Sequence, residues 1–373
     1  MKHPHLDPDG LWLGRVNRKG VGPAVVTLRD GLLIDITTRV APTVRDVLER
    51  DDATDYLAGV SGEPLGPVES PPAELQWLTP CDFQAIKACG VTFAGSMVER
   101  VIEERASGDP DQAEGIRKRI AARIGNSLAN LVPGSPQAEK VKQELMSAGL
   151  WSQYLEVGIG PYAEVFSKAQ VLSAVGFGAE VGLHPISRWN NPEPEVVLAV
   201  NSRGDILGAT LGNDVNLRDV EGRSALLLSK AKDNNASCAI GPMIRLFDGR
   251  FTLDTVRNIE LDLFVTGKDG FELRDTCQMN EISRDPTDLV GQTIGRHHQY
   301  PDGLMLLLGT LFAPTVDRSA PGQGFTHNIG DTVSISCAEL GLLINTVQLS
   351  TSCPEWTFGP SALMRNLAAR NLL

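Results

Sequence analysis

The sequence contains no apolar stretch that approaches the roughly 20 residues of a membrane-spanning helix. Residues 1–10, which read MKHPHLDPDG, also lack the apolar core that is typical of a signal peptide. We therefore expect a protein without a membrane partner and with a cytoplasmic location.

No block of basic residues is present that would bind a nucleic acid. Lysine and arginine together number 34 against 46 aspartates and glutamates, which leaves a net charge of −12. Because phosphate binding requires a concentrated positive surface, this balance argues against a nucleic-acid partner. Hydrophobic residues make up 42% of the 373 residues, so a folded protein with a large core is expected.

The six cysteines form no Cys-x-x-Cys pair. Scattered cysteines of this kind are typical of reduced thiols in a cytosolic protein. A disulfide framework or a zinc site built on cysteine is therefore not expected.

The pattern of the chain predicts two domains, residues 1–75 and residues 76–373. The first contains short β-like runs around the turn Arg29-Asp30-Gly31 and then a short helix. Within the second, residues 96–150 are charged, rich in alanine and helical in pattern. This helical insertion is expected either to close over a site or to cover the domain and contact a second copy of the chain.

Three carboxylates are placed where they can converge on one ion. Glu193 and Glu195 stand at the head of an apolar run, and side chains two residues apart on a strand share a face. Residues 201–205 read as a hairpin turn, so that the returning strand would carry Asp214 back toward the pair. Such hard oxygen donors suit Mg²⁺, Mn²⁺ or Ca²⁺. An acidic, solvated strand entrance is the alternative for an isolated Glu-x-Glu.

Further motifs along the chain carry a resemblance to a known protein family. Together with the Glu-x-Glu strand, the chain resembles the fumarylacetoacetate hydrolase superfamily over roughly residues 82 to 350. The motifs are Asn-Asp-Val-x-x-Arg-Asp at 213–219, Lys232 before Gly241-Pro242, Gly-Asp-Thr-Val at 330–333, and the apolar run at 341–347. The resemblance implies a mixed α+β protein, usually dimeric, in which a twisted β-roll catalytic domain carries a small N-terminal α/β domain. It also implies a divalent ion, Mg²⁺ or Mn²⁺, held by Glu193, Glu195 and Asp214.

The segment 87–99 resembles the family's lid, in which a histidine and a glutamate form a water-activating pair. Here the glutamate position is Glu99 and the histidine position is Ser96. A serine cannot act as a base near neutral pH, whereas an imidazole can. Ser96 is therefore expected either at the catalytic position or as the N-cap of a helix, because Ser-x-x-Glu also matches a capping box.

The resemblance assigns substrate contacts to further residues. Lys232 is expected to reach the bound substrate, either binding its carboxylate or transferring a proton. Lys168 is expected to face the site, although an exposed lysine at a strand end is equally common. Arg218 is read mainly as a supporting ion pair that borders the substrate, and Glu221 and Thr310 as contacts to its polar tail and carboxylate.

Such a site suits chemistry on a small-molecule 2-oxo acid. A metal ion stabilises the negative charge that develops on the keto oxygen when a C3 proton is removed. Because Ser96 leaves the water-activating pair incomplete, we favour a dehydratase, a lyase that acts on a 2-keto-3-deoxy sugar acid of five carbons and gives 2-oxoglutarate semialdehyde through a metal-stabilised enolate, with Glu99 as proton carrier. The alternatives are a 2,4-diketo-3-deoxy sugar acid hydrolase that cleaves a C–C bond, and a non-catalytic protein that binds a metal and an oxo acid. A homodimer or higher homo-oligomer is expected.

Overall fold

A computed structural model describes residues 3–128, 131–310, 312, 314, 316–318 and 324–373. Its centre is an 11-stranded sheet with the order β4-β3-β2-β1-β11-β10-β9-β14-β6-β7, to which β5 is added by pairing with β1. The strands of this sheet are β1 (Trp12–Arg18), β2 (Gly22–Arg29), β3 (Leu32–Asp35), β4 (Glu63–Pro67), β5 (Leu75–Trp77), β6 (Ala85–Gly90), β7 (Glu164–Ala169), β9 (Pro194–Val200), β10 (Ile206–Asp214), β11 (Cys238–Leu246) and β14 (Leu304–Leu307).

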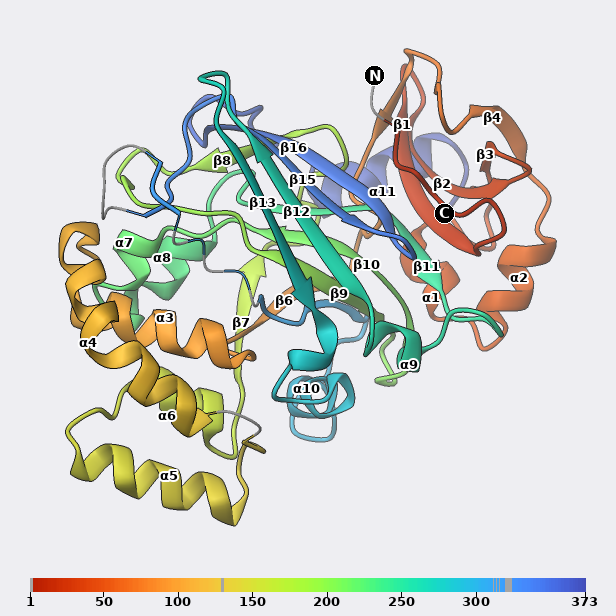
Figure 1. Cartoon of the computed structure of the whole chain (residues 1–373). Coiled ribbons are helices and arrows are strands. Elements are labelled where there is room, and N and C mark those ends of the chain that lie inside the picture. The colour runs from red at the N-terminus through yellow and green to blue at the C-terminus, as the bar shows by residue number, and fades with distance from the viewer. Residues whose placement is uncertain (1–2, 129–130, 311, 313, 315, 319–323) are drawn as a thin grey trace.

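A smaller, five-stranded sheet packs on one face of the large sheet (Figure 1). Its order is β13-β12-β15-β16-β8, antiparallel except for the β16–β8 pair. The strands are β8 (Glu180–Leu183), β12 (Glu260–Thr266), β13 (Glu272–Gln278), β15 (Thr332–Cys337) and β16 (Gly341–Leu349). Side chains of β12, β15 and β16 share one hydrophobic core with those of β9 and β10, so the two sheets form a single packed body.

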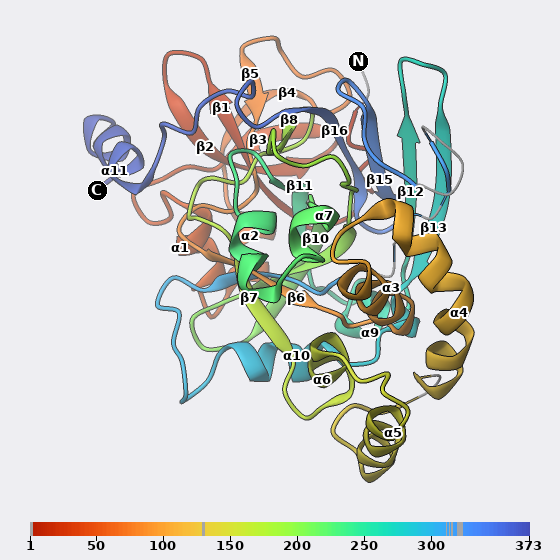
Figure 2. The same cartoon turned by 90° about the vertical axis from the view of Figure 1, so that its left-hand side faces the viewer.

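The helices cover the outside of the sheets. Figure 1 and Figure 2 both show α3 to α6 gathered together, and in Figure 1 α1 and α2 lie on the opposite side of the molecule. The α-helices are α1 (Val44–Leu48), α2 (Ala53–Gly59), α3 (Ala94–Arg105), α4 (Pro110–Leu128), α5 (Pro136–Ser147), α6 (Gln153–Ile159), α7 (Arg218–Glu221), α8 (Leu228–Lys232), α9 (Leu253–Val256), α10 (Pro286–Thr293) and α11 (Pro360–Ala369), and short 3₁₀ turns lie at Ala225–Leu227 and Met279–Glu281. Among the described residues, no helix combines the length and the apolarity that crossing a membrane requires.

Strand β9 explains why the centre of the large sheet is apolar on both sides. Val196, Leu198 and Val200 belong to the core shared with the small sheet, whereas Val197 and Ala199 belong to a second core beneath α1 and α2. A strand that is covered on both faces is apolar at every position rather than at alternate ones. The glutamates at its head are therefore the first polar groups that the strand offers.

The N-terminal region joins the large sheet edge to edge. Strand β1 pairs with β11 through Trp12↔Arg245 and Leu13↔Ile244. Residues of α1 also share the second core with β9, β11 and β14. The domain boundary at residue 75 stays a prediction, and residues 12–35 supply strands to the same sheet that carries the carboxylates. All six cysteines are buried.

Candidate metal and substrate site

The structure brings Glu193, Glu195 and Asp214 together at the end of the β9–β10 hairpin. One carboxylate oxygen from each residue lies within 4.8 Å of the others, and all three residues are buried. The pairing Gly212↔Glu195 places the end of β10 beside the head of β9, and the Asp214 N–H donates to the Glu193 carbonyl at 3.0 Å. The cluster lies inside the protein, so a solvated strand entrance does not describe it. Their role as metal ligands stays a prediction.

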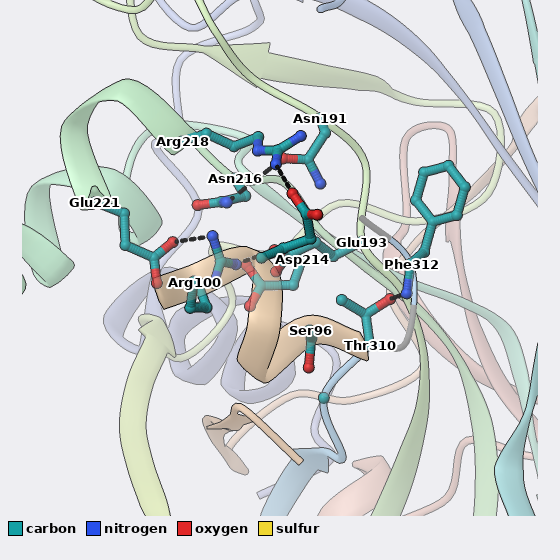
Figure 3. A network of polar contacts seen from close by, with 12 residues as sticks. Ser96, Arg100, Asn191, Glu193, Asp214, Asn216, Arg218, Glu221, Thr310 and Phe312 are labelled. Atoms are coloured by element: carbon teal, nitrogen blue, oxygen red, sulfur yellow. Dashed lines mark hydrogen bonds and ion pairs between the residues drawn. The ribbon is translucent and has the colours of Figure 1, made fainter. Parts of the chain in front are cut away.

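Cationic side chains form ion pairs with two of the three carboxylates, Glu193 and Asp214. Lys232 Nζ lies 2.5 Å from Glu193 Oε2 and 3.1 Å from Asp214 Oδ2. Lys168 Nζ lies 2.8 Å from Asp214 Oδ1. The other oxygen of Glu193, Oε1, is bound by the guanidinium of Arg100 from helix α3 (Figure 3).

Among the residues that the structure describes, none forms an ion pair with Glu195, whose carboxylate instead accepts a hydrogen bond from the Gly309 N–H at 2.7 Å. Burial, and then the charges of Asp214 and Glu193, raise its pKa well above the ordinary value. Gly309 has a φ of +91°, and a Cβ there would lie 2.1 Å from Thr92 Oγ1, so only glycine can present this N–H. The next residue, Thr310, lines the cavity beside the carboxylates.

This donor set fits a hard divalent cation. Carboxylate oxygens are the preferred ligands of Mg²⁺ and Mn²⁺. A crowded, buried carboxylate without a counterion, such as Glu195, is stabilised when a cation binds beside it. We therefore take Glu193, Glu195 and Asp214 as the residues that would hold the ion.

Lys168 and Lys232 are both fully inside the protein, so the alternative of an exposed Lys168 is wrong. Lys168 Nζ also donates to the Val215 carbonyl at 3.2 Å and to the Lys232 carbonyl, which fixes it behind Asp214. Burial lowers the pKa of Lys232, but Asp214 and Glu193 outweigh burial and hold that pKa above its ordinary value. Lys232 is therefore protonated in the metal-free protein and cannot accept a proton there.

The lid residues differ from their predicted arrangement at Ser96. Helix α3 begins at Ala94 with Phe93 as N-cap, and the Ser96 hydroxyl donates to the Phe93 carbonyl at 2.9 Å. The capping-box prediction for Ser96 is therefore wrong, because the helix begins three residues earlier than the motif requires. Ser96 is buried and lines the cavities on both sides of Arg100.

Glu99 is engaged by two guanidinium groups. Its carboxylate lies 2.7 Å from Arg117 and 3.2 Å from Arg218. Arg218 is itself buried, pairs with Glu103 at 2.7 Å and stacks on the Trp189 ring at 4.3 Å. The prediction that Arg218 makes supporting ion pairs agrees with these contacts, and its substrate contact stays a prediction.

Three candidate functional residues were not predicted from the sequence. They are Arg100, Glu103 and Glu164. Glu103 joins Arg100 to Arg218, with contacts of 2.6 and 2.7 Å. Glu164 begins β7 opposite Gly90, whose missing side chain leaves room for the Glu164 carboxylate. Burial raises the pKa of Glu164, and it lines the cavity of the three carboxylates, whereas Glu99 lines the neighbouring one. The only signal in the sequence was the alternation of charges at Glu99, Arg100 and Glu103 along one helix.

Glu221 is a further carboxylate of this network, and burial makes its charged form unfavourable. It lies 3.1 Å from Arg100. Burial raises its pKa to about 7 against the opposing attraction of Arg100 and Lys232, and the nearby Glu193 and Glu103 add to the rise. Its contact to a substrate stays a prediction.

The raised pKa of Glu221 has a consequence for stability. A glutamate with a higher pKa in the folded state stabilises the fold fully below its unfolded pKa, and this contribution is lost as the pH rises through about 7. Glu221→Gln should remove this loss. Between pH 4.5 and pH 8, the free energy of unfolding of the wild type should therefore fall by roughly 2–3 kcal/mol relative to that of the variant. Urea unfolding in EDTA at both pH values measures the difference. A constant difference between the two proteins would show that Glu221 stays ionised throughout.

A buried carboxylate triad with a lysine across it lies at the end of a strand hairpin, and its three carboxylates could hold a divalent ion. Residues 164–348 match the family described as Fumarylacetoacetate (FAA) hydrolase C-terminal. The resemblance to the fumarylacetoacetate hydrolase superfamily that the motifs indicated is therefore confirmed over these residues.

Two characterised or assigned relatives are similar in sequence. The chain is 31% identical over 190 residues to 2-dehydro-3-deoxy-D-arabinonate dehydratase of Saccharolobus solfataricus, which covers 50% of this chain and 58% of that protein. It is 29% identical over 210 residues to the probable 2-keto-3-deoxyxylonate dehydratase of Haloferax volcanii, which covers 56% of this chain and 68% of that protein. The match thus spans little more than half of the first relative's length.

Solved structures share the fold along almost the whole chain. A 2-keto-3-deoxy-D-arabinonate dehydratase complexed with magnesium and 2,5-dioxopentanoate superposes with a TM-score of 0.64 at 20% identity, over 91% of this chain and 99% of the other. A 5-carboxymethyl-2-hydroxymuconate delta-isomerase from Mycobacterium smegmatis gives 0.54 at 18% identity, over 90% and 98%. At these identities the likeness shows the fold, and the expected fold class is confirmed.

Proposed function

We propose that the protein is a metal-dependent hydro-lyase that removes water from a five-carbon 2-keto-3-deoxy sugar acid and releases 2,5-dioxopentanoate, which is 2-oxoglutarate semialdehyde. The observation that carries this proposal is the buried triad of Glu193, Glu195 and Asp214 facing Lys232. Support comes from the two sequence relatives, since both are named as dehydratases of such acids.

The ion that the triad would hold is Mg²⁺. It is the metal in the similar dehydratase structure, and the three hard oxygen donors suit it. When bound, the ion supplies positive charge where negative charge develops on the keto oxygen, which makes a C3 proton more acidic.

The side chains around the triad are proposed to supply the base, the proton donor and the group that binds the substrate carboxylate. Glu164 is the base best placed to take the C3 proton, because it lines the same cavity and its raised pKa makes it a stronger base than an exposed glutamate. Lys232, held protonated by two carboxylates, is placed to give a proton to the departing C4 hydroxyl. The resulting C3=C4 enone becomes 2,5-dioxopentanoate when a C5 proton is transferred to C3 and the C5 enol tautomerises to the aldehyde. Thr310, adjacent to the N–H that fixes Glu195, is placed to bind the substrate carboxylate. Glu99, the proton carrier expected from the lid motif, remains a candidate to be tested against Glu164.

The reaction is tested by its product. Incubation of the purified protein and Mg²⁺ with 2-keto-3-deoxypentonates should release an aldehyde that trapping and mass spectrometry identify as 2,5-dioxopentanoate. Formation of pyruvate together with a two-carbon fragment would instead identify cleavage of a C–C bond. Tight binding of the oxo acid without turnover would identify a binding protein, and either result would overturn the proposal.

Location and assembly are also proposals. The composition and the sugar-acid chemistry support a cytoplasmic enzyme that acts on small molecules. A homodimer or a higher homo-oligomer is proposed from the family resemblance, and sedimentation would measure it.

A further inference from the structure

Arg100 sits between the metal site and the rest of the lid network. Its guanidinium binds Glu193 Oε1 and lies 2.6 Å from Glu103 and 3.1 Å from Glu221 (Figure 3). Both oxygens of Glu193 are therefore taken, Oε1 by Arg100 and Oε2 by Lys232. An ion that used Glu193 as a ligand would have to replace one of these cations.

Three cations already lie against the triad. Arg100 and Lys232 contact Glu193, and Lys168 and Lys232 contact Asp214. Adding a divalent ion to this buried cluster brings like charges within a few ångströms of one another, and such repulsion is strong away from water. A divalent ion therefore binds best when one of the cations withdraws.

Arg100 is the cation that can withdraw. Lys168 is completely buried and is held by Asp214 and two backbone carbonyls, and Lys232 bridges two members of the triad. Arg100, by contrast, already contacts two carboxylates outside the triad, Glu103 and Glu221. It can leave Glu193 without losing its counterions.

The cavities around Arg100 show a second reason for it to move. One cavity of about 20 Å³ lies beside the triad and another of about 10 Å³ lies beside Glu99 and Arg218, and Arg100 lines both. Neither has room for more than a water molecule, so a five-carbon acid cannot enter. Withdrawal of Arg100 from Glu193 would join the two spaces.

From this geometry we infer that Arg100 is a tethered cation that fills the metal position of the empty enzyme, and that metal entry shifts it onto Glu221 and Glu103 and so opens the space for substrate. Arg100 is a positioning residue and not a ligand in this inference, which rests on the proposed metal function of the triad. It predicts that removing the charge of Arg100 strengthens metal binding. A residue that merely supported Glu193 would weaken metal binding when it is lost.

The test is a titration of the metal-free protein with Mn²⁺, in which calorimetry and the electron paramagnetic resonance signal of free Mn²⁺ report the dissociation constant. Arg100→Met should lower this constant by about tenfold or more, because a like charge is removed from the site. Arg105→Met is the matched control, since Arg105 is an exposed arginine of the same helix that donates to the Gly149 carbonyl at 2.9 Å, and it should leave the constant unchanged. If the methionine variant does not fold, Arg100→Gln should show the same tightening.

An unchanged or a higher dissociation constant in the folded Arg100 variants, with Mn²⁺ still bound by the wild type, overturns the inference and leaves the proposed function standing. Absence of Mn²⁺ binding in the wild type and in every variant overturns the proposed metal function and the inference with it. The two failures are therefore distinguishable in one series of titrations.

Discussion

EDTA treatment should abolish turnover of the sugar acid, and added Mg²⁺ should restore it. The loss should reach a factor on the order of 10³ or more, because stabilising the charge on the keto oxygen supplies several kcal/mol of the barrier reduction. The triad carries this expectation, since its ligand atoms lie within 4.8 Å of one another in a buried site. Turnover is followed through the aldehyde product, with and without chelator.

Glu195→Gln tests the same metal assignment by removing the charge of one predicted ligand. The pKa of Glu195 is raised well above its ordinary value by burial, so its charge destabilises the metal-free fold. The variant should therefore bind Mg²⁺ more weakly while unfolding at an equal or higher urea concentration than the wild type in EDTA. Asp262→Asn, at an exposed carboxylate of β12, is the matched control and should change neither property. Full activity in EDTA, or normal metal affinity in Glu195→Gln, would contradict the metal assignment.

The hairpin that carries the triad was predictable because its signals are local. An apolar run, a turn rich in polar residues and glycine, and a second apolar run fix both strands, and a two-residue repeat fixes which side chains share a face. The structure has these strands as β9 and β10, with Asp214 as the last residue of β10 and not beyond it. The N-terminal strand β1, by contrast, was not predicted. Its partner β11 is separated from it by more than 200 residues, so nothing local marks the pairing.

The residues that escaped prediction depend on tertiary contacts. Arg100 and Glu103 look like an ordinary charged helix face, yet the structure buries Glu103 between Arg100 and Arg218. Glu164 has no motif of its own and becomes a candidate only because β7 pairs with β6 beside the triad. Ser96 is a different case. Ser96 and Glu99 match the pattern of a capping box, but the helix begins at Ala94. Helix ends are set by backbone contacts that a short motif does not encode.

The identity of the proton carrier is the second large expected effect, and it separates Glu164 from Glu99. Glu164→Gln should lower kcat by a factor on the order of 10² or more, as removal of a general base generally does. The substitution keeps the size of the side chain, and Glu164 is no member of the triad, so the dissociation constant for Mn²⁺ should change little. Single-turnover kinetics with a 2-keto-3-deoxypentonate measure the chemical step directly.

Glu99→Gln is the comparison that decides between the two carboxylates. Arg117 and Arg218 hold Glu99 in ion pairs of 2.7 and 3.2 Å, so its carboxylate is already engaged before a substrate binds. Its loss should loosen the lid and raise KM more than it lowers kcat, because the ion pairs order α3 against α4 and α7. If Glu99→Gln instead lowers kcat by a factor on the order of 10² while Glu164→Gln turns over normally, then the lid carboxylate is the proton carrier and must leave its arginines during the reaction. Normal turnover in both variants would leave Lys232 as the group that moves the proton, which would require the bound metal to release it from Glu193 and Asp214.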